Sequence, residues 1–250
     1  MRRSTYLALA AAGLALFLGL WELLPRLGLV NRTLLPPPSD IPAAFAAELR
    51  AGYWQVAVVD SFRHYLYGLT LGTGLGVALG VAAALAPRFE AATAWVVRLL
   101  RPIPGLAWVP FAIIWFGISE QAATFIIVVG VLWINFFASY AAVRAVDRDL
   151  LEVADAFGHR RWLPKLVKIV LPAAAAGILG GVRTGLGQGW MSVVAAELFG
   201  IPGLGSRMMQ ASSLLATETV VVYMITIAVL YGLTDSLFGL LRDRVLAWQR

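Results

Sequence analysis

The sequence has 250 residues, of which 60% are hydrophobic and only 14% are charged, and its mean hydropathy is +0.79. This composition excludes an ordinary soluble globular domain and predicts an all-α integral membrane protein. The net charge of +6 is compatible with nucleic-acid binding, but a membrane protein acquires the same excess when arginine and lysine gather on one side of the bilayer. The chain has no cysteine, which excludes disulfides and thiolate metal sites.

Six stretches of the chain reach the length of about 20 mostly apolar residues that a membrane-spanning helix needs. They cover residues 5–24, 62–85, 92–117, 121–143, 171–198 and 219–241. The first could be a signal peptide, but its apolar stretch is long and no cleavage site follows it, so we expect a retained anchor. The third contains Pro102, Pro104 and Pro110, and we therefore expect a kinked or partly interfacial helix there.

The basic residues predict that both termini lie in the cytoplasm. With six spans and a cytoplasmic N-terminus, the cytoplasmic side receives Arg2, Arg3, Arg88, Arg98, Arg101, Arg144, Arg148, Arg160, Arg161, Lys165, Lys168, Arg242, Arg244 and Arg250. The outer side receives only Arg26, Arg32, Arg50, Arg63 and Arg207. This asymmetry follows the positive-inside rule and explains the net charge without nucleic acid.

Two of the expected helices carry glycine at every fourth position. The positions are Gly68, Gly72, Gly76 and Gly80 in the second span, and Gly177, Gly181, Gly185 and Gly189 in the fifth. This spacing places each set along one helix face, where two backbones can approach closely. We expect both faces to be buried against other helices, either as static packing or as surfaces that slide during a transport cycle.

A short charged segment, LLEVADAFGHRRWLPKLVKIVLP at 150–172, interrupts the apolar sequence. Asp149 and Glu152 have the spacing of a capping box, and Gly158 suits the residue after a helix C-terminus. A helix of about two turns is marginal in water unless its apolar side docks on another surface. That surface is either the protein's own bundle or a separate cytoplasmic protein. The basic residues at 160–168 fit a topogenic signal or a contact with anionic lipid.

The run EVADAFG at 152–158, followed by IVLP at 169–172, resembles the EAA loop of permease subunits of ABC importers. Three other stretches are similar to the nitrate, sulfonate and taurine branch of that family: LLPPPSDI at 34–41, LRPIPGLAWVPFAIIWFGIS at 100–119 and VLPAAAAGILGGVRTGLGQGWMSVVAAELFG at 170–200. The resemblance implies an N-terminal helix and periplasmic segment at 1–61, and a permease core at 62–250 whose coupling loop covers 144–170.

The resemblance also implies that the short helix inserts into a groove on an ATP-binding subunit. The residues expected to make this contact are Glu152, Ala154, Asp155, Phe157 and Gly158. Val153 stands where the family usually has a second small residue, and the spacing from Gly158 to Pro172 is one residue longer than the common pattern. Further implied partners are a second permease copy as a homodimer and a periplasmic or lipid-anchored binding protein facing 25–60 and 201–219.

No G-x-x-x-x-G-K-[ST] motif occurs, so we expect no cofactor on this chain and place ATP and magnesium on a partner ATPase. An intramembrane hydrolase is one alternative, because Ser206 in GLGSRMM resembles a nucleophile turn, but the two histidines, His64 and His159, are predicted near opposite membrane faces. An ion-coupled secondary transporter is another, yet it needs ionisable groups at mid-membrane, and Glu22, Glu197 and Asp235 all read as close to helix ends.

Branch similarity predicts a small oxyanion such as a sulfonate or nitrate as the solute, with pyrimidine precursors and aromatic acids as alternatives. Arg183 lies about eleven residues beyond Pro172, roughly 16 Å along the fifth span and near mid-bilayer. A charge there is expected to face a cavity or a partner rather than lipid. Arg183 therefore either helps an anion cross or pairs with an acidic side chain, and Gln188 and Trp190 could line the same path. No residue is predicted to bind a metal.

Overall fold

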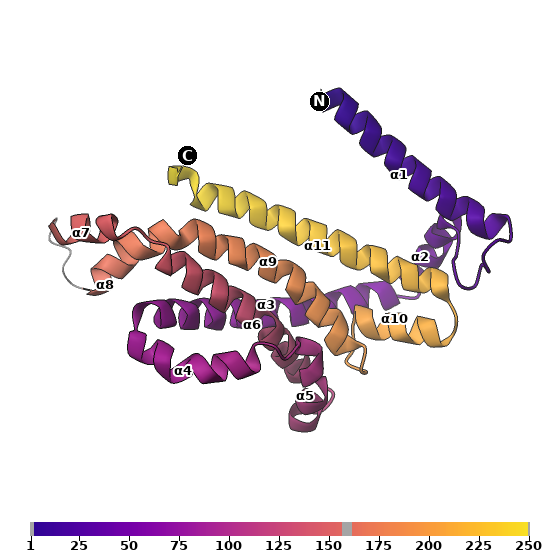
Figure 1. Cartoon of the computed structure of the whole chain (residues 1–250). Helices are drawn as coiled ribbons and strands as arrows, with labels where there is room; N and C mark the ends of the chain where they lie inside the picture. The colour runs from indigo at the N-terminus through magenta and orange to yellow at the C-terminus, as the bar shows by residue number, and fades with distance from the viewer. Residues whose placement is uncertain (1–2, 157–161, 250) are drawn as a thin grey trace. The chain divides into compact units, whose positions relative to one another are not determined.

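The computed structural model describes residues 3–156 and 162–249, and all regular structure within them is helical. The helices group into two compact units. Unit 1 contains Met1–Asp60 and Pro202–Ala228, and unit 2 contains Ser61–Ile201 and Val229–Arg250. Two long helices, α3 (Tyr53–Leu85) and α11 (Thr217–Val245), contribute residues to both units. Figure 1 shows the elements in chain order.

Unit 1 is held together by polar contacts between its short elements and its long helices. Its elements are α1 (Arg3–Arg26), η1 (Pro38–Asp40), α2 (Ile41–Arg50), α10 (Leu204–Ser213) and the first parts of α3 and α11. Trp21 donates its indole N–H to the carbonyl of Pro36 at 2.9 Å, which ties the loop after α1 back onto that helix. Trp54 of α3 donates to Thr226 of α11 at 2.9 Å. The second bond connects two segments that are 172 positions apart in the sequence.

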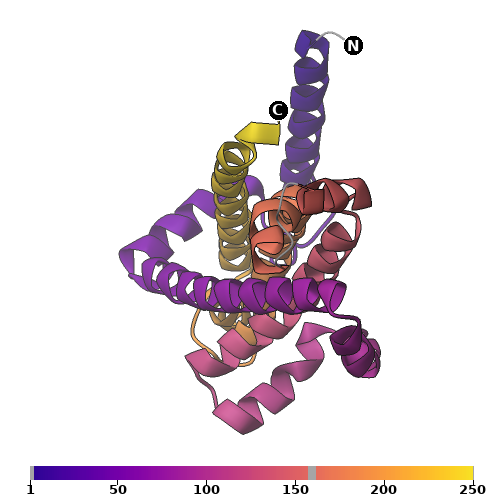
Figure 2. The ribbon, with the colours of Figure 1, turned by 90° about the vertical axis from the view of Figure 1, so that its left-hand side faces the viewer.

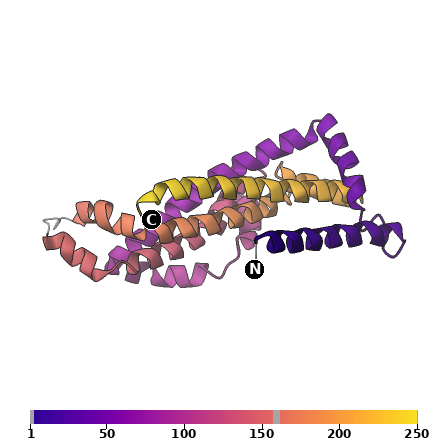
Figure 3. The same ribbon diagram turned by 90° about the horizontal axis from the view of Figure 1, so that it is seen from above.

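Unit 2 holds most of the buried apolar residues. Its remaining elements are α4 (Pro87–Leu100), η2 (Gly105–Trp108), α5 (Val109–Phe116), α6 (Glu120–Arg144), α7 (Arg148–Ala156), α8 (Trp162–Lys165), η3 (Leu166–Val170), α9 (Leu171–Glu197) and η4 (Ala247–Gln249). Helices α6 and α9 lie side by side (Figures 1 and 2). Helices α7 and α8 lie at one end of the unit (Figure 3).

The glycine faces bring α3, α6 and α9 together. All four glycines of the α3 set are buried, and a Cβ added at Gly80 would meet the backbone carbonyl of Phe136 in α6. In α9, the corresponding neighbour of Gly181 is Ala138, again in α6. The expectation of buried glycine faces is confirmed for α3 and for three of the four positions in α9, whereas Gly177 is exposed. Close backbone approach is therefore what orders this bundle.

The expected third span is more strongly broken than a kinked helix. α4 and the η2–α5 segment meet at 88°, and this bent pair is either a broken span or a re-entrant loop. The break falls at Pro102 and Pro104, because proline cannot donate the helical hydrogen bond and restricts the residue before it. The predicted interruption is therefore confirmed, and it separates two helical segments, α4 and η2–α5. Beyond the break, Val109 and Ala112 pack against α6 in a cluster that includes Ile126.

The other five spans are confirmed by length and composition. They are Thr5–Arg26, Tyr53–Leu85, Glu120–Arg144, Leu163–Glu197 and Thr217–Val245. The second begins at Tyr53 rather than at 62, because the helix continues through Asp60 and Arg63. The fifth includes a π-helical turn, η3, in which the N–H of Leu171 bonds the carbonyl of Leu166. Such a turn holds one residue more than an α-helical turn.

Candidate functional site

The short charged segment forms helix α7, which begins at Arg148. Its cap is Asp147, whose side-chain oxygen accepts the N–H of Asp149 at 3.0 Å. The capping box with Asp149 as the cap is therefore wrong, since that residue already lies in the first turn and the preceding aspartate is correctly placed to accept its N–H. The predicted end of this helix, Phe157 and Gly158, lies outside the described residues.

One side of α7 packs on its own unit and another side does not. Leu151 contacts a core cluster formed by the ends of α3, α6 and η3, which includes Ala84, Val143 and Val170. Leu150 is 49% exposed, and Glu152 is exposed beside it. Both alternatives for the docking partner are therefore supported. The protein's own bundle covers Leu151. Leu150 and Glu152 stay available for contact with another protein. The roles of Glu152, Ala154 and Asp155 stay predictions.

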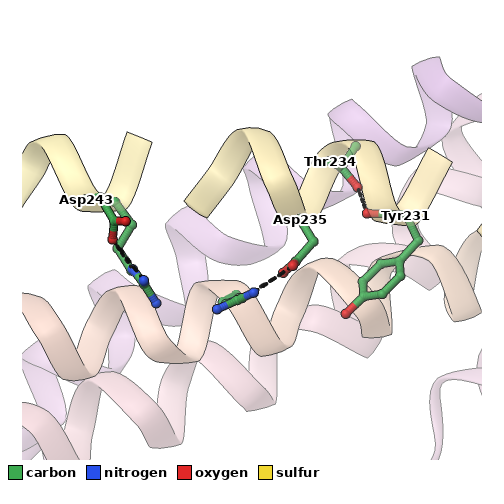
Figure 4. A network of polar contacts seen from close by, with 6 residues as sticks. Tyr231, Thr234, Asp235 and Asp243 are labelled. Atoms are coloured by element: carbon green, nitrogen blue, oxygen red, sulfur yellow. Dashed lines mark hydrogen bonds and ion pairs between the residues drawn. The ribbon is translucent and has the colours of Figure 1, made fainter. Parts of the chain in front are cut away.

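Arg183 of α9 forms a two-point ion pair with Asp235 of α11. Its Nε donates to Oδ1 and its Nη2 donates to Oδ2, both at 2.7 Å (Figure 4). The arginine side chain is 44% exposed and the aspartate 22%. Asp235 lies in the interior of α11, ten residues before Val245, so the expectation that it sits near a helix end is wrong. A parallel two-point contact fixes the guanidinium plane and leaves its other N–H donors directed away from the carboxylate.

Gln188 and Trp190 do not join Arg183 in one cluster. The amide nitrogen of Gln188 lies beside Gly130 of α6. Trp190 is 2% exposed, stacks on Tyr65 with ring centroids 4.4 Å apart, and donates to Thr234 of α11 at 3.3 Å. The structure therefore directs Gln188 and Trp190 to different neighbours, and their part in a translocation path stays a prediction.

A buried polar cluster joins α3 and α9 and was not predicted. Ser61 donates to both carboxylate oxygens of Glu197 at 2.8 Å, and His64 Nδ1 lies 2.9 Å from Glu197 Oε1. Ser61 and Glu197 are 0% exposed and His64 is 2% exposed. The spacing of Ser61 and His64, three residues apart in an apolar helix, was a signal that both side chains share one face. Such a buried carboxylate needs its hydrogen bonds to remain in place.

The two segments expected to face a binding protein meet in unit 1. Arg207 of α10 donates to Glu48 of α2 at 2.9 Å, and Thr217 donates to the carbonyl of Thr33 at 2.7 Å. Desolvation opposes the charge on Arg207, but hydrogen bonds to Tyr223 and Glu48 raise the pKa of its guanidinium above the ordinary value. A groove of about 520 Å³ lies between these segments, and its lining includes Arg32, Thr33, Asp40, Leu215 and Glu218.

The hydroxyl of Ser206, the candidate nucleophile, is engaged by the backbone of its own turn. The hydroxyl of Ser206 accepts the N–H of Gly203 at 3.0 Å and donates to its carbonyl at 2.9 Å. Ser206 therefore caps the start of α10 rather than resembling an activated nucleophile. Within 3–156 and 162–249, no group of three or more histidine or acidic side chains is arranged to hold a metal ion.

Comparison with known proteins defines the class. Residues 74–247 match the model of the binding-protein-dependent transport system inner membrane component. The chain is 33% identical to the putative aliphatic sulfonates transport permease protein SsuC of Bacillus subtilis (strain 168), over 94% of this chain and 85% of the relative. It is 34% identical to the protein of the same description in Escherichia coli (strain K12), over 91% of this chain and 87% of that relative. The taurine transport system permease protein TauC of E. coli is 30% identical, over 98% and 91%.

Solved structures show the same fold. A chain of the MetNI methionine ABC transporter in an inward-facing conformation superimposes with a TM-score of 0.56 at 20% identity, covering 79% of this chain and 94% of that chain. A chain of an amino acid ABC transporter superimposes with a TM-score of 0.57 at 16% identity, covering 80% of this chain and 95% of that chain. This chain therefore belongs to the family of binding-protein-dependent inner-membrane transport components, and it is a permease of the ABC importer type.

Proposed function

We propose that this chain moves a small oxyanion, with an aliphatic sulfonate as the first candidate, into the cell as one half of a homodimeric pore. The observation that carries the proposal is the similarity to the two sulfonate permeases over more than nine-tenths of this chain. The relatives named for taurine and for bicarbonate, the latter 28% identical, also handle solutes that carry an anionic oxygen group. Nitrate, pyrimidine precursors and aromatic acids remain alternative solutes.

In this proposal ATP hydrolysis takes place in separate subunits, which bind ATP and magnesium, and α7 transmits their movement to the membrane helices. Support comes from the exposed Leu150 and Glu152 on a helix whose Leu151 packs on its own unit. Gly158→Val should disturb the turn after α7, because a β-branched residue disfavours the backbone expected there. Gly28→Val is the control, since Gly28 has a φ of +73° in unit 1 and lies outside the coupling loop.

Stimulation of the ATPase by the reconstituted permease tests this coupling role. Gly158→Val should lose most of the stimulation while inserting normally, and Gly28→Val should keep it. Equal stimulation by Gly158→Val and the unaltered protein would count against α7 as the coupling element.

The charge asymmetry supports a topology with both termini in the cytoplasm. Cysteines at Ser39 and Ser213 should then react with an impermeant thiol reagent added outside, and a cysteine at position His159 should react only in inverted vesicles. The absence of native cysteine makes each label specific. Labelling of position 159 from the outside would contradict the proposed topology.

The solute is tested by reconstituting the permease with its ATPase and binding protein and measuring stimulated ATP hydrolysis and uptake. Ethanesulfonate, taurine, nitrate, bicarbonate and an aromatic carboxylate are compared at equal concentration. A sulfonate should give the largest response. Stimulation by the aromatic carboxylate alone would identify an aromatic acid as the solute. Uptake that needs an ion gradient but no ATPase would favour a secondary transporter.

A further inference from the structure

A groove of about 440 Å³ lies between α4 and α6 within unit 2, apart from the Arg183–Asp235 pair and from the coupling helix. Its lining consists of Ala94, Val97, Arg98, Arg101, Pro102 and Phe137. Two guanidinium groups thus stand beside a wall of apolar side chains. This combination is complementary to an anionic group attached to a hydrocarbon chain.

Both arginines lack an acidic partner in the described part of the chain. The guanidinium of Arg101 lies 4.2 Å from the ring centroid of Phe137, and that of Arg98 lies 5.1 Å from the ring of Trp95. Neither forms an ion pair with any carboxylate that the structure describes in 3–156 and 162–249, where the side chain of Asp155 is not among those described. A contact with a ring face uses no N–H donor, so the in-plane donors remain available for an anion.

The one acidic residue of α4 is engaged elsewhere. Glu90 accepts the hydroxyl hydrogen of Tyr140 at 2.5 Å, and its other oxygen lies 4.0 Å from Arg144. It does not line the groove. The positive charge in the groove is therefore not neutralised from the same helix.

The groove lies at a depth where a lipid phosphate is within reach. Phe137 stands seven residues before Arg144, the last residue of α6, which is about 10 Å along the helix axis. Helix α6 has 25 residues and is about 37 Å long, which exceeds the hydrocarbon core of about 30 Å. An arginine at this level can extend its apolar stem toward the end of the helix and hold its guanidinium at the boundary between hydrocarbon and headgroups.

The surface around the groove is apolar. Trp95, Val96 and Leu99 of α4 are 68%, 54% and 66% exposed. In a chain with five helices long and apolar enough to span a bilayer, such a surface is suited to acyl chains, and tryptophan is enriched at the level of the headgroups. A lipid held in the groove by its phosphate would place its acyl chains next to this surface.

We propose that this groove binds one anionic phospholipid, with its phosphate on Arg98 and Arg101 and an acyl chain along Val97 and Phe137. The phosphate oxygens can accept hydrogen bonds from in-plane donors of both arginines, and the ring of Phe137 and the side chain of Val97 form the wall for the hydrocarbon. The negative charge of the lipid offsets part of the charge of these two arginines, which have no carboxylate partner among the described side chains.

The tryptophan beside Arg98 allows the site to be observed directly. The full chain is reconstituted in phosphatidylcholine vesicles that contain a minor fraction of either bromine-labelled phosphatidylglycerol or bromine-labelled phosphatidylcholine. Bromine quenches nearby tryptophan, and the difference between the unaltered protein and Trp95→Phe isolates the signal of Trp95 from the other eight tryptophans, since the chain has nine. Trp95 should be quenched more strongly by the anionic lipid than by the zwitterionic one.

Variants test which arginines cause the preference. Arg98→Gln and Arg101→Gln should each reduce the preference for phosphatidylglycerol by roughly fivefold, since that is the usual contribution of one basic residue to binding an anionic lipid. The matched control is Arg88→Gln, which makes the same charge change on α4 but at an exposed residue that does not line the groove, and it should retain the preference. The double replacement by lysine should retain part of it, because the charge remains.

Three outcomes would overturn the proposal. Equal quenching of Trp95 by both lipids would show that no anionic lipid is selected. Equal losses in Arg88→Gln and Arg98→Gln would reduce the effect to general surface charge. Relief of the phosphatidylglycerol quenching by dissolved ethanesulfonate would assign the groove to a soluble anion. Ethanesulfonate that leaves the quenching unchanged supports the lipid.

Discussion

Helix α9 contributes to two contacts that involve a carboxylate, and the two contacts differ in their exposure to solvent. At its last residue, Glu197 is fully buried and accepts hydrogen bonds from Ser61 with His64 beside it. Further up the same helix, Arg183 is 44% exposed and is bound to Asp235 of α11. A buried carboxylate has no water to replace a lost partner, whereas an exposed pair can exchange its partner for water, another subunit or a solute. The difference suggests that the first contact fixes the fold and that the second is available for transport.

Removing Glu197 should produce the largest loss of stability. Glu197→Ala removes the buried carboxylate that Ser61 and His64 share, and the loss of a buried hydrogen-bond partner costs about 1–3 kcal/mol for each group that loses it. Thermal unfolding of the purified protein in detergent measures the loss. Glu120→Ala is the control, because Glu120 is exposed at the start of α6. If both variants unfold at the same temperature, the buried cluster does not stabilise the fold.

The packing of α3 on α6 should be the next most sensitive feature. Gly80→Ala places a methyl group against the backbone carbonyl of Phe136, and overpacking of this kind costs about 1–3 kcal/mol. Gly74→Ala is an internal control, since Gly74 lies in the same helix with no atom within 4 Å of an added Cβ. Unfolding in detergent should separate the two variants, with Gly74→Ala at or above the stability of the unaltered protein.

Replacing Arg183 should affect transport more than stability. Arg183→Gln keeps hydrogen-bonding capacity and removes the charge, so an anion-conducting role predicts at least about a tenfold lower uptake rate, as for the loss of a specific ionic contact in a transition state. Assembly and basal ATPase activity should be unchanged, because the pair is exposed. Asp235→Asn is the companion variant, which leaves the guanidinium without its carboxylate.

The Arg183 variant distinguishes the two roles of the ion pair. Uptake at the native rate, or loss of the assembled complex before uptake can be measured, would make the pair a structural contact like that of Glu197.

The smallest effect is expected at Thr234, which lies next to Asp235 and accepts the indole N–H of the buried Trp190. Thr234→Val removes the acceptor of the Trp190 N–H at 3.3 Å and the donation of the Thr234 hydroxyl to the carbonyls of Leu230 and Tyr231 at 3.0 and 2.9 Å, and a neutral hydrogen bond of this kind is worth about 1 kcal/mol. A lower unfolding temperature with normal uptake would place Trp190 with the stabilising contacts. A change in solute preference at unchanged stability would instead support Trp190 as part of the path.

Local sequence signals predicted much of this architecture. Five spans follow from runs of apolar residues, the buried glycine faces follow from a spacing of four, and the interruption of the third span follows from Pro102 and Pro104. Each of these features depends on residues that are close together in the sequence. The coupling loop and the family were predicted from short motifs of the same kind.

Contacts between distant helices could not be predicted in the same way. His64 and Glu197 are separated by 133 positions, and their meeting depends on the register of α3 against α9, which no local pattern encodes. Asp235 was misplaced because α11 continues to Val245, beyond the apolar run that ends near 241. The start of α3 was missed because Asp60 lowers the local hydropathy just before residue 62, although it lies inside the helix.

The wide turn at Leu166–Val170 has a consequence for how this protein can tolerate changes of length. One inserted residue would rotate all later positions of a regular α-helix by about 100°, and Gly181 would then no longer face Ala138 of α6. A π-helical turn absorbs a single insertion locally, so the phase of the helix beyond it is kept. The segment between α7 and α9 can therefore differ in length by one residue among homologous permeases while the buried helix face stays aligned.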